Sequence, residues 1–329
     1  MARSKQQKKA KGIAAWPLYV LLIAFFALYI YYQSSLDLSV LFGISALFFL
    51  AAVIVVEFIN SIREEGKANG IMEIVGVVIV VLVIWIALRF VLNTSQPLDV
   101  VPSCSMLPTL NRGDLIALQG ISNASQIKAP VVDVTPSEWN STMADMQDEF
   151  TACILYNSTS GRIDQYMRPG DVVALDQEQL GKGIGRVVAN SSQSGLIRYD
   201  CGLQNVSTSA GIQQEAYTKY VVVNGTVIRE NLNNSIVVYQ TTPKDLFYME
   251  GDEYIVHRAY AVIDAGGSYY VLTKGDNNPG LDIQYANYPP NLSSIKGKVV
   301  ASIPYIGFLK LALSNQIATP AGCNSTVIH

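Results

Sequence analysis

The sequence predicts three N-terminal transmembrane α-helices followed by a mainly β soluble domain. Half of the 329 residues are hydrophobic, and they are concentrated in the first third of the chain. Three long apolar runs lie there, over residues 14–32, 39–59 and 71–92. Each approaches or exceeds the roughly 20 residues that an α-helix needs to cross about 30 Å of hydrocarbon. Beyond Leu92, short alternating stretches separated by Gly-Asp, Asn-Gly and Pro-Gly pairs are typical of strands and turns.

Basic residues beside the apolar runs predict a multi-pass cell-membrane protein of defined orientation. Five Lys or Arg residues precede the first run, Arg63 and Lys67 follow the second, and the loop between these two runs has none. By the positive-inside rule, residues 1–13 are cytoplasmic and residues 93–329 lie outside. A cleavable signal peptide is the alternative interpretation of the first run. It is disfavoured because the run is longer than a typical signal segment and lacks a small-residue cleavage site.

Glycosylation signals agree with this orientation. The sequence contains ten Asn-x-Ser/Thr sequons after the last apolar run and none before it, which indicates a translocated, glycosylated face. The sequons begin at Asn93, Asn123, Asn140, Asn157, Asn190, Asn205, Asn224, Asn233, Asn291 and Asn324.

The soluble part has no pattern typical of a nucleic-acid or metal site. The net charge is −3, and no basic stripe or stacking motif follows the apolar runs, which disfavours nucleic-acid binding. The four cysteines form no CxxC pair and have no partnering histidines, so no metal or other cofactor is predicted. A disulfide can form outside the cell. Cys153 and Cys201 are the predicted pair, because both fall in the irregular middle of the chain.

Two polar segments interrupt the predicted β domain. They cover about residues 120–164 and 177–252 and are dense in Ser, Asn and Gln. We interpret them as insertions or a cap on a smaller β core, with long surface loops as the alternative. Within the second segment, an Asn-Gly pair at residues 224–225 predicts a tight hairpin turn. The one helical pattern after the apolar runs, residues 306–317, is too short for a fourth span.

The sequence contains two histidines, the residue type that most readily acts as an acid or a base near neutral pH. Of the two histidines, His329 is the last residue of the sequence and a poor candidate for a rigid site, which leaves His257 in "DEYIVHRAYAV". A lone histidine is more often structural, unless an acid and a nucleophile accompany it. Asp276 and Asp282 lie in the turn "GDNNPGLD" directly after an apolar strand pattern. A calcium loop is the alternative for this turn, disfavoured because its carboxylates are too few.

The stretch "PSCSMLPTL" offers a nucleophile. Pro102 and Pro108 stiffen the backbone on either side of Ser103, Cys104 and Ser105. A serine hydroxyl is a weak nucleophile until a neighbouring base takes its proton, so it has to be held within hydrogen-bond reach of that base. A rigid segment can hold a hydroxyl in this way.

Five stretches resemble, in chain order, the motif boxes of type I signal peptidases. They are "PSCSMLPTLNRGDLIAL", "RPGDVVAL", "EYIVHRAYAV", "VLTKGDNNPGLD" and "IKGKVVASIPYIGFLKLAL". The resemblance is to the archaeal and endoplasmic-reticulum branch, in which a histidine replaces the general-base lysine of most bacterial enzymes. It implies a signal-peptidase-like β-fold for the soluble domain and the activity of a serine endopeptidase.

The resemblance also implies roles for individual residues. Ser105 matches the nucleophile and His257 the general base. Asp282 matches the more critical acid, which orients the histidine, and Asp276 a supporting one. The backbone N–H of Ser105 and the hydroxyl of Ser103 match the oxyanion hole.

Met106 and Pro108 match substrate-groove residues. The implied partners are signal-peptide-bearing preproteins cut at small-residue, Ala-x-Ala-like sites near the outer membrane surface, the lipid bilayer, and the secretion translocon. The histidine base together with the many sequons favours an archaeal source.

Three alternatives stay open at this point. Cys104 is disfavoured as the nucleophile because it is offset by one position from the motif serine and on a strand would point the other way. Lys274 could serve as the base of a Ser-Lys peptidase, although His257 occupies the position of the lysine box. The chain could also be a glycosylated membrane receptor or an inactive scaffold, for which a change of Ser105 would leave function intact.

Overall fold

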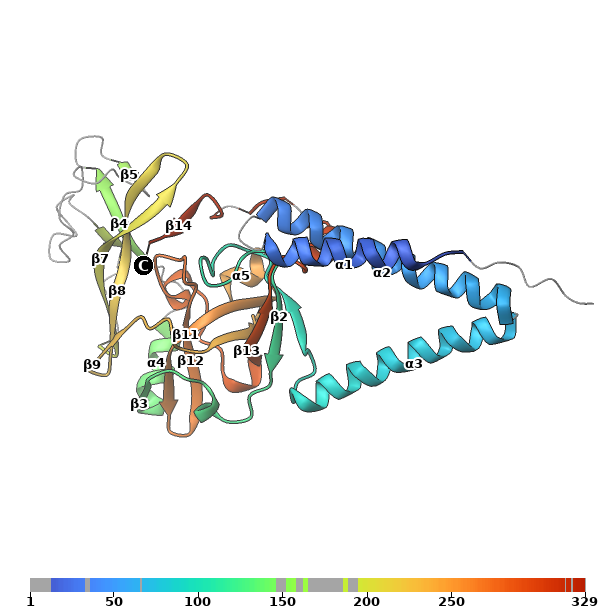
Figure 1. Ribbon diagram of the computed structural model, residues 1–329. Coiled ribbons are helices and arrows are strands. Elements are labelled where there is room, and N and C mark those ends of the chain that lie inside the picture. The colour runs from blue at the N-terminus through green and yellow to red at the C-terminus, as the bar shows by residue number, and fades with distance from the viewer. Residues whose placement is uncertain are drawn as a thin grey trace, which may run out of the picture.

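The computed structural model shows three N-terminal helices followed by a mainly β region. In Figure 1 the helices project from one end of the β region, and a second sheet lies at its other end. The structure describes residues 13–32, 36–65, 67–145, 152–157, 162–164, 186–188, 195–316, 318–320 and 322–328.

The three helices form where the apolar runs predict them. They are α1 (Trp16–Tyr31), α2 (Leu36–Glu65) and α3 (Lys67–Val91). α1 packs along α2, where the rings of Phe25 and Phe49 stack with centroids 5.2 Å apart. α3 diverges from this pair in Figure 1.

The helices differ in their capacity to cross a membrane. Within the described residues, one helical stretch, Leu38–Ile62, is long and apolar enough by length and composition. The apolar stretches Trp16–Tyr31 and Val75–Val91 are shorter. Residues 77–84 of α3 are each 50% to 58% exposed, so the protein covers no face of this stretch. By this measure the structure supports one spanning helix where the sequence predicts three.

A seven-stranded sheet forms the centre of the β region. Its strands run in the order β1 (Leu98–Val100), β2 (Leu115–Gln119), β13 (Ile295–Ile303), β10 (Ile236–Gln240), β11 (Tyr254–Ala265) and β12 (Ser268–Lys274), with β3 (Val131–Val134) also paired to β11. The β3–β11 pair is parallel and the others are antiparallel. β11 is buried along most of its length, because Ile255 and Ala259 belong to one hydrophobic cluster and Val256 to another. A central strand with both faces covered holds its side chains rigidly.

Part of each segment that the sequence analysis interprets as an insertion belongs to this sheet. β10 lies between β13 and β11, although it falls within the predicted insertion 177–252. β3 falls within the predicted insertion 120–164 and pairs with β11. The same segment also forms α4 (Pro136–Asp145), a helix that the sequence analysis missed. A strand pattern in the sequence does not indicate which sheet the strand will join.

A second sheet of four strands is built from the second polar segment and residues near the end of the sequence. Its order is β14 (Ser325–Val327), β7 (Ile197–Thr208), β8 (Gly211–Val223) and β9 (Thr226–Arg229). The predicted hairpin turn is confirmed, since Val223 pairs with Thr226 and the φ angles of Asn224 and Gly225 are +47° and +75°. A smaller sheet has the order β5 (Arg162–Asp164), β4 (Ala152–Asn157) and β6 (Arg186–Val188).

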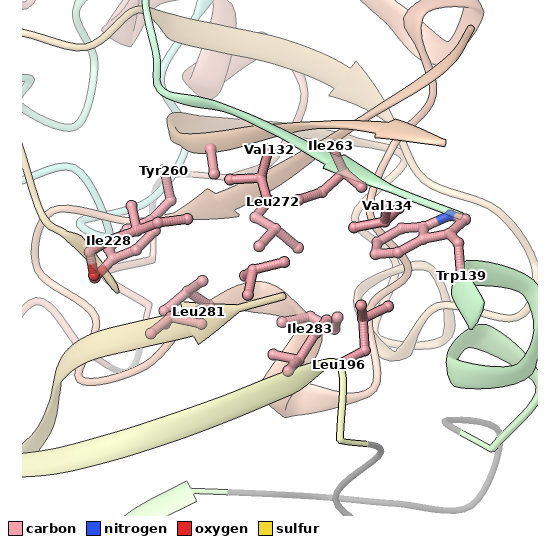
Figure 2. Packing of buried hydrophobic residues seen from close by; sticks show 14 of the residues in the cluster. Val132, Val134, Trp139, Leu196, Ile228, Tyr260, Ile263, Leu272, Leu281 and Ile283 are labelled. Atoms are coloured by element: carbon pink, nitrogen blue, oxygen red, sulfur yellow. The ribbon is translucent and has the colours of Figure 1, made fainter. Parts of the chain in front are cut away.

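One hydrophobic core joins the main sheet to the second sheet (Figure 2). Val132 and Val134 of β3, Trp139 of α4 and Ile263 of β11 lie on one side of it, and Ile228 of β9 belongs to the same cluster. Leu281 and Ile283, from the loop after β12, are 0% and 4% exposed and pack into this core. The core therefore fixes the position of Asp282, the residue between them.

Both pairs of cysteines are joined. The predicted disulfide between Cys153 and Cys201 is present. A second disulfide, which the sequence analysis did not predict, joins Cys104 to Cys323 across 219 residues of sequence.

Short helices complete the fold. They are the 3-10 turns η1 (Ala124–Gln126), η4 (Asp282–Tyr285) and η5 (Leu292–Ser294) and the α-helices α5 (Leu246–Met249) and α6 (Phe308–Leu313). α6 covers six of the residues predicted as helical over 306–317.

Substitution of Gly113 tests how tightly the segment before β2 packs against α6. Its φ of +86° disfavours any L side chain, and a Cβ at this position would overlap the ring of Phe308 in α6. We expect Gly113→Ala to destabilise the protein by about 2–5 kcal/mol, from backbone strain of about 1–2 kcal/mol and overpacking of about 1–3 kcal/mol. Gly211→Ala is the matched control, since φ is +99° there but nothing lies within 4 Å of the added Cβ. Thermal unfolding in detergent measures both variants, and equal losses would contradict the packing.

Candidate active site

Ser105 lies in a loop of consecutive turns between β1 and β2, which we call the serine loop (residues 101–114). The backbone N–H of Val101 donates to the carbonyl of Asp114 at 3.0 Å, and that of Gly113 donates to the carbonyl of Val101 at 2.8 Å. These bonds close the base of the loop. Because the segment is not a strand, the strand argument against Cys104 was wrong, and this residue is instead unavailable because it forms the disulfide to Cys323.

The serine loop brings Ser105 to His257 of β11. Ser105 Oγ lies 3.0 Å from His257 Nε2. On the other side of the ring, Nδ1 lies 2.8 Å and 2.7 Å from the two carboxylate oxygens of Asp282. His257 is 3% exposed and Asp282 2%. With the proton on Nδ1, the imidazole donates to the carboxylate and leaves Nε2 free to accept from the serine hydroxyl.

Asp282 has a second partner in the core. The hydroxyl of Tyr239, from β10, donates to Asp282 Oδ2 at 2.9 Å. Burial raises the pKa of the Tyr239 phenol well above its usual value, so the hydroxyl stays protonated and remains a donor. The sequence analysis missed Tyr239, because nothing in "NSIVVYQTT" relates it to an acid more than 40 residues away.

Ser103 lies beside the serine nucleophile candidate. Its Oγ is 3.1 Å from Ser105 Oγ. The backbone of Ser105 is held from the other side, since its carbonyl accepts the backbone N–H of Asn277 at 2.7 Å. The two hydroxyls therefore lie side by side on a loop that is held in place by the turn after β12.

Asp276 does not contact the histidine. Among the hydrogen bonds of the described residues, none joins it to His257. Its carboxylate instead pairs with Arg258, whose Nε and Nη2 donate to it at 2.8 Å and 2.6 Å. It also accepts the hydroxyl of Thr109 at 2.5 Å. Asp276 is thus linked to the serine loop through Thr109 and not to the imidazole, which corrects its expected place as a second orienting acid.

The two expected groove residues lie elsewhere. Met106 is 0% exposed and packs with Leu110, Ile116 and Val256 under the serine loop. It cannot line an open groove. Pro108 is exposed but does not line the pocket described next.

A pocket of about 440 Å³ opens beside Ser105 and His257. Phe247 of α5 lines it and meets the imidazole edge-on, with ring centroids 5.9 Å apart. Asp252 also lines it, and partial burial raises the pKa of this carboxyl while the neighbouring His257 opposes the shift. The remaining lining residues are Pro102, Ser103, Arg112, Glu250, Tyr254, Ile255, Val256, Asn278, Gln316, Ala318, Thr319 and Pro320.

The other sequence candidates lie away from the serine. Lys274 is buried, and its ammonium donates to the carboxylate of Glu230 at 2.9 Å. In the described hydrogen bonds, the Ser105 hydroxyl meets Ser103 and His257 and no lysine. His329 lies outside the described residues. Likewise, the described part of the chain holds no cluster of three potential metal ligands.

The Ser105 hydroxyl is hydrogen-bonded to an imidazole, and the other nitrogen of this ring contacts a buried carboxylate. This arrangement is typical of serine hydrolases. No family model matches the chain. It is similar to the "Signal peptidase complex catalytic subunit SEC11" of Verticillium alfalfae, 38% identical over 96 residues, or 28% of this chain and 52% of the relative. The same subunit of Colletotrichum graminicola is 38% identical over 94 residues, and that of Pyricularia oryzae is 37% identical over 96.

The chain thus spans about half the length of the curated relatives it matches. These relatives confirm the resemblance to the endoplasmic-reticulum type of signal peptidase. They are fungal, so the comparisons give no support for the expected archaeal source.

The Arg258–Asp276 pair yields a prediction about stability. Removal of one partner leaves the other charge buried and unpaired, so we expect Asp276→Ala to lower the free energy of unfolding by roughly 3–5 kcal/mol. The double variant Asp276→Leu with Arg258→Met should regain most of this loss, since neither charge then remains. Lys310→Ala is the control, because Lys310 pairs with Asp99 but is 63% exposed and should lose at most about 1 kcal/mol. Chemical unfolding compares the variants, and similar losses in Asp276→Ala and Lys310→Ala would refute the structural role.

Proposed function

We propose that the protein is a membrane-bound serine endopeptidase that removes signal peptides from secreted preproteins, as the catalytic subunit of a signal peptidase. The observation that carries the proposal is the continuous contact from Ser105 through His257 to Asp282. The similarity to fungal signal peptidase catalytic subunits supports the same reaction.

The geometry supports a two-step acyl transfer. His257 Nε2 takes the proton of the Ser105 hydroxyl as the oxygen attacks the scissile carbonyl. The imidazolium then protonates the leaving amine, and an acyl-enzyme remains until water, activated by the same imidazole, releases it. Asp282 stays ionised and stabilises the imidazolium, since both of its oxygens face Nδ1.

Ser103 is proposed as part of the oxyanion hole. Its hydroxyl is next to the position of attack, and the backbone N–H of Ser105 supplies a second donor to the developing negative charge. Loss of one such donor typically removes about 2.7–4 kcal/mol of transition-state stabilisation.

We further propose that all three helices span a membrane, with the N-terminus cytoplasmic. The apolar stretches of α1 and α3 measure 16 and 17 residues, or about 25 Å of helix, close to the hydrocarbon thickness. Two features support a position of the site near the outer surface. The hydroxyl of Tyr29 at the end of α1 donates to the carbonyl of Pro304 at 2.5 Å, and Ser105 follows α3 by 14 residues, under about 50 Å even when extended.

A site in this place suits signal-peptide cleavage. The bond to be cut follows the apolar core of a signal peptide and is flanked by small, Ala-x-Ala-like residues. Preproteins are therefore the proposed substrates, delivered by the secretion translocon, and other subunits of a signal peptidase complex are the proposed partners.

Substitution of the three contacting residues tests the proposal. We expect Ser105→Ala, His257→Ala and Asp282→Asn each to reduce kcat for a reporter preprotein by roughly 10⁴-fold or more, because the three groups act as a unit. Binding of the preprotein should persist in Ser105→Ala. The measurement is cleavage by the purified protein in detergent, with Ser268→Ala, a change of an exposed serine at the start of β12, as the control. Normal processing by Ser105→Ala would favour the receptor or scaffold alternative.

Tyr239 should act on the rate through Asp282. A hydrogen bond to a charged group contributes about 1.5–3 kcal/mol, so we expect Tyr239→Phe to lower kcat by about 10- to 100-fold and to leave KM unchanged. Tyr260→Phe is the matched control, because it removes a buried phenol that donates to the Ile228 carbonyl at 3.1 Å, away from the acid. Equal kcat losses in the two variants would show a general packing effect.

A further inference from the structure

The end of the described chain lines the candidate active site. Of the segment 316–328, here called the C-terminal segment, the residues Gln316, Ala318, Thr319 and Pro320 border the pocket beside Ser105. The other lining residues come mainly from the serine loop, from α5 with the loop after it, and from β11. The C-terminal segment is therefore a separate wall of this pocket.

A disulfide attaches this wall directly beside the serine. Cys323 is bonded to Cys104, the residue before Ser105. Asn277 adds a second link, since its Nδ2 donates to the carbonyls of Cys104 at 3.2 Å and Ser325 at 2.9 Å. Any displacement of the wall would have to break or move these contacts at the serine.

Arg112 holds the pocket side of the segment. Its Nε donates to the carbonyl of Pro102 in the serine loop at 2.9 Å, and its Nη2 donates to the carbonyl of Ala318 at 3.1 Å and also to that of Gln316. The guanidinium lies over the ring of Phe308, 5.4 Å from its centroid, and Arg112 is 8% exposed. The buried guanidinium of Arg112 therefore links the wall to the serine loop through these hydrogen bonds.

The far end of the segment is fixed to the second sheet. β14 pairs with β7, with Ser325 opposite Thr208 and Val327 opposite Val206. The backbone N–H of Val327 also donates to Asn277 Oδ1 at 2.8 Å. Residues 318–320 therefore lie between attachments on both sides, which gives their side chains a defined position.

We infer that the C-terminal segment determines which substrate side chains the pocket accepts. This inference rests on the proposed peptidase function. Ala318, Thr319 and Pro320 carry no charge, and their segment is held by the disulfide and by Arg112, so this wall offers no ionic partner and does not yield to a large side chain. A peptide residue that packs against it is selected by size, and the expected ligand is a small, uncharged side chain close to the cleaved bond.

Ala318→Leu tests the role of the wall. One methylene in a substrate pocket changes specificity by about 10- to 200-fold. We expect Ala318→Leu to raise KM at least about 10-fold for reporter preproteins with Ala before the cleaved bond, and less for those with Gly, while kcat stays within about threefold. Ile328→Ala is the control, because Ile328 belongs to the same segment, is 46% exposed and does not line the pocket.

A binding assay gives a second readout that is independent of turnover. In the Ser105→Ala background, Ala318→Leu should weaken binding of a fluorescent signal peptide by a similar factor. The double variant Cys104→Ala with Cys323→Ala should instead relax selection, so that Val or Leu before the cleaved bond becomes a better substrate relative to Ala. Cys153→Ala with Cys201→Ala controls for the loss of a disulfide away from this wall.

The outcomes separate the two proposals. Cleavage that depends on Ser105, with a KM raised selectively by Ala318→Leu, supports the wall. Cleavage that depends on Ser105, with KM and peptide binding unchanged in Ala318→Leu, overturns the wall and leaves the peptidase intact. Absence of Ser105-dependent cleavage in the unmodified protein overturns the peptidase, and the inference with it.

Discussion

The contact between the buried carboxylate of Asp282 and Nδ1 of His257 is the interaction on which the rest of the site depends. It sets the tautomer of the imidazole, and only one tautomer leaves Nε2 able to accept from Ser105. The carboxylate is 2% exposed, and the hydroxyl of Tyr239 supplies it with a further hydrogen bond that offsets part of the cost of burial. The aspartate is in turn placed by its neighbours Leu281 and Ile283, whose side chains pack into the core.

The polar segments of the sequence contribute to this placement. In β8 of the second sheet, the backbone N–H of Thr218 donates to the carbonyl of Pro279 at 2.7 Å, and its hydroxyl donates to Gln284 at 2.8 Å. Gln284 also accepts the backbone N–H of Leu281 at 2.8 Å. The second sheet is therefore a support for the acid-bearing loop as well as a cover on the main sheet.

The sequence was most informative where chemistry is local. The rigid serine stretch, the single internal histidine and the aspartate turn could each be recognised from neighbouring residues, as could the Asn-Gly hairpin. Contacts between distant segments could not. Asp276 pairs with Arg258 and not with the imidazole, and Met106 packs in the core. Partners from other parts of the chain determine both positions. The place of β10 in the main sheet could not be predicted for the same reason, since its neighbours β11 and β13 define it as a central strand.

The Cys104–Cys323 bond turns the β region into a covalent ring. Ser105, His257 and Asp282 all lie inside this ring, with almost the whole of both sheets. A backbone cut at any surface turn between the two cysteines therefore leaves the molecule in one piece until a reductant is added. Closure of a loop of 219 residues also restricts the unfolded chain, by about 5 kcal/mol in the chain-entropy description. One cross-link beside the serine thus keeps the strands of a large domain within reach of one another.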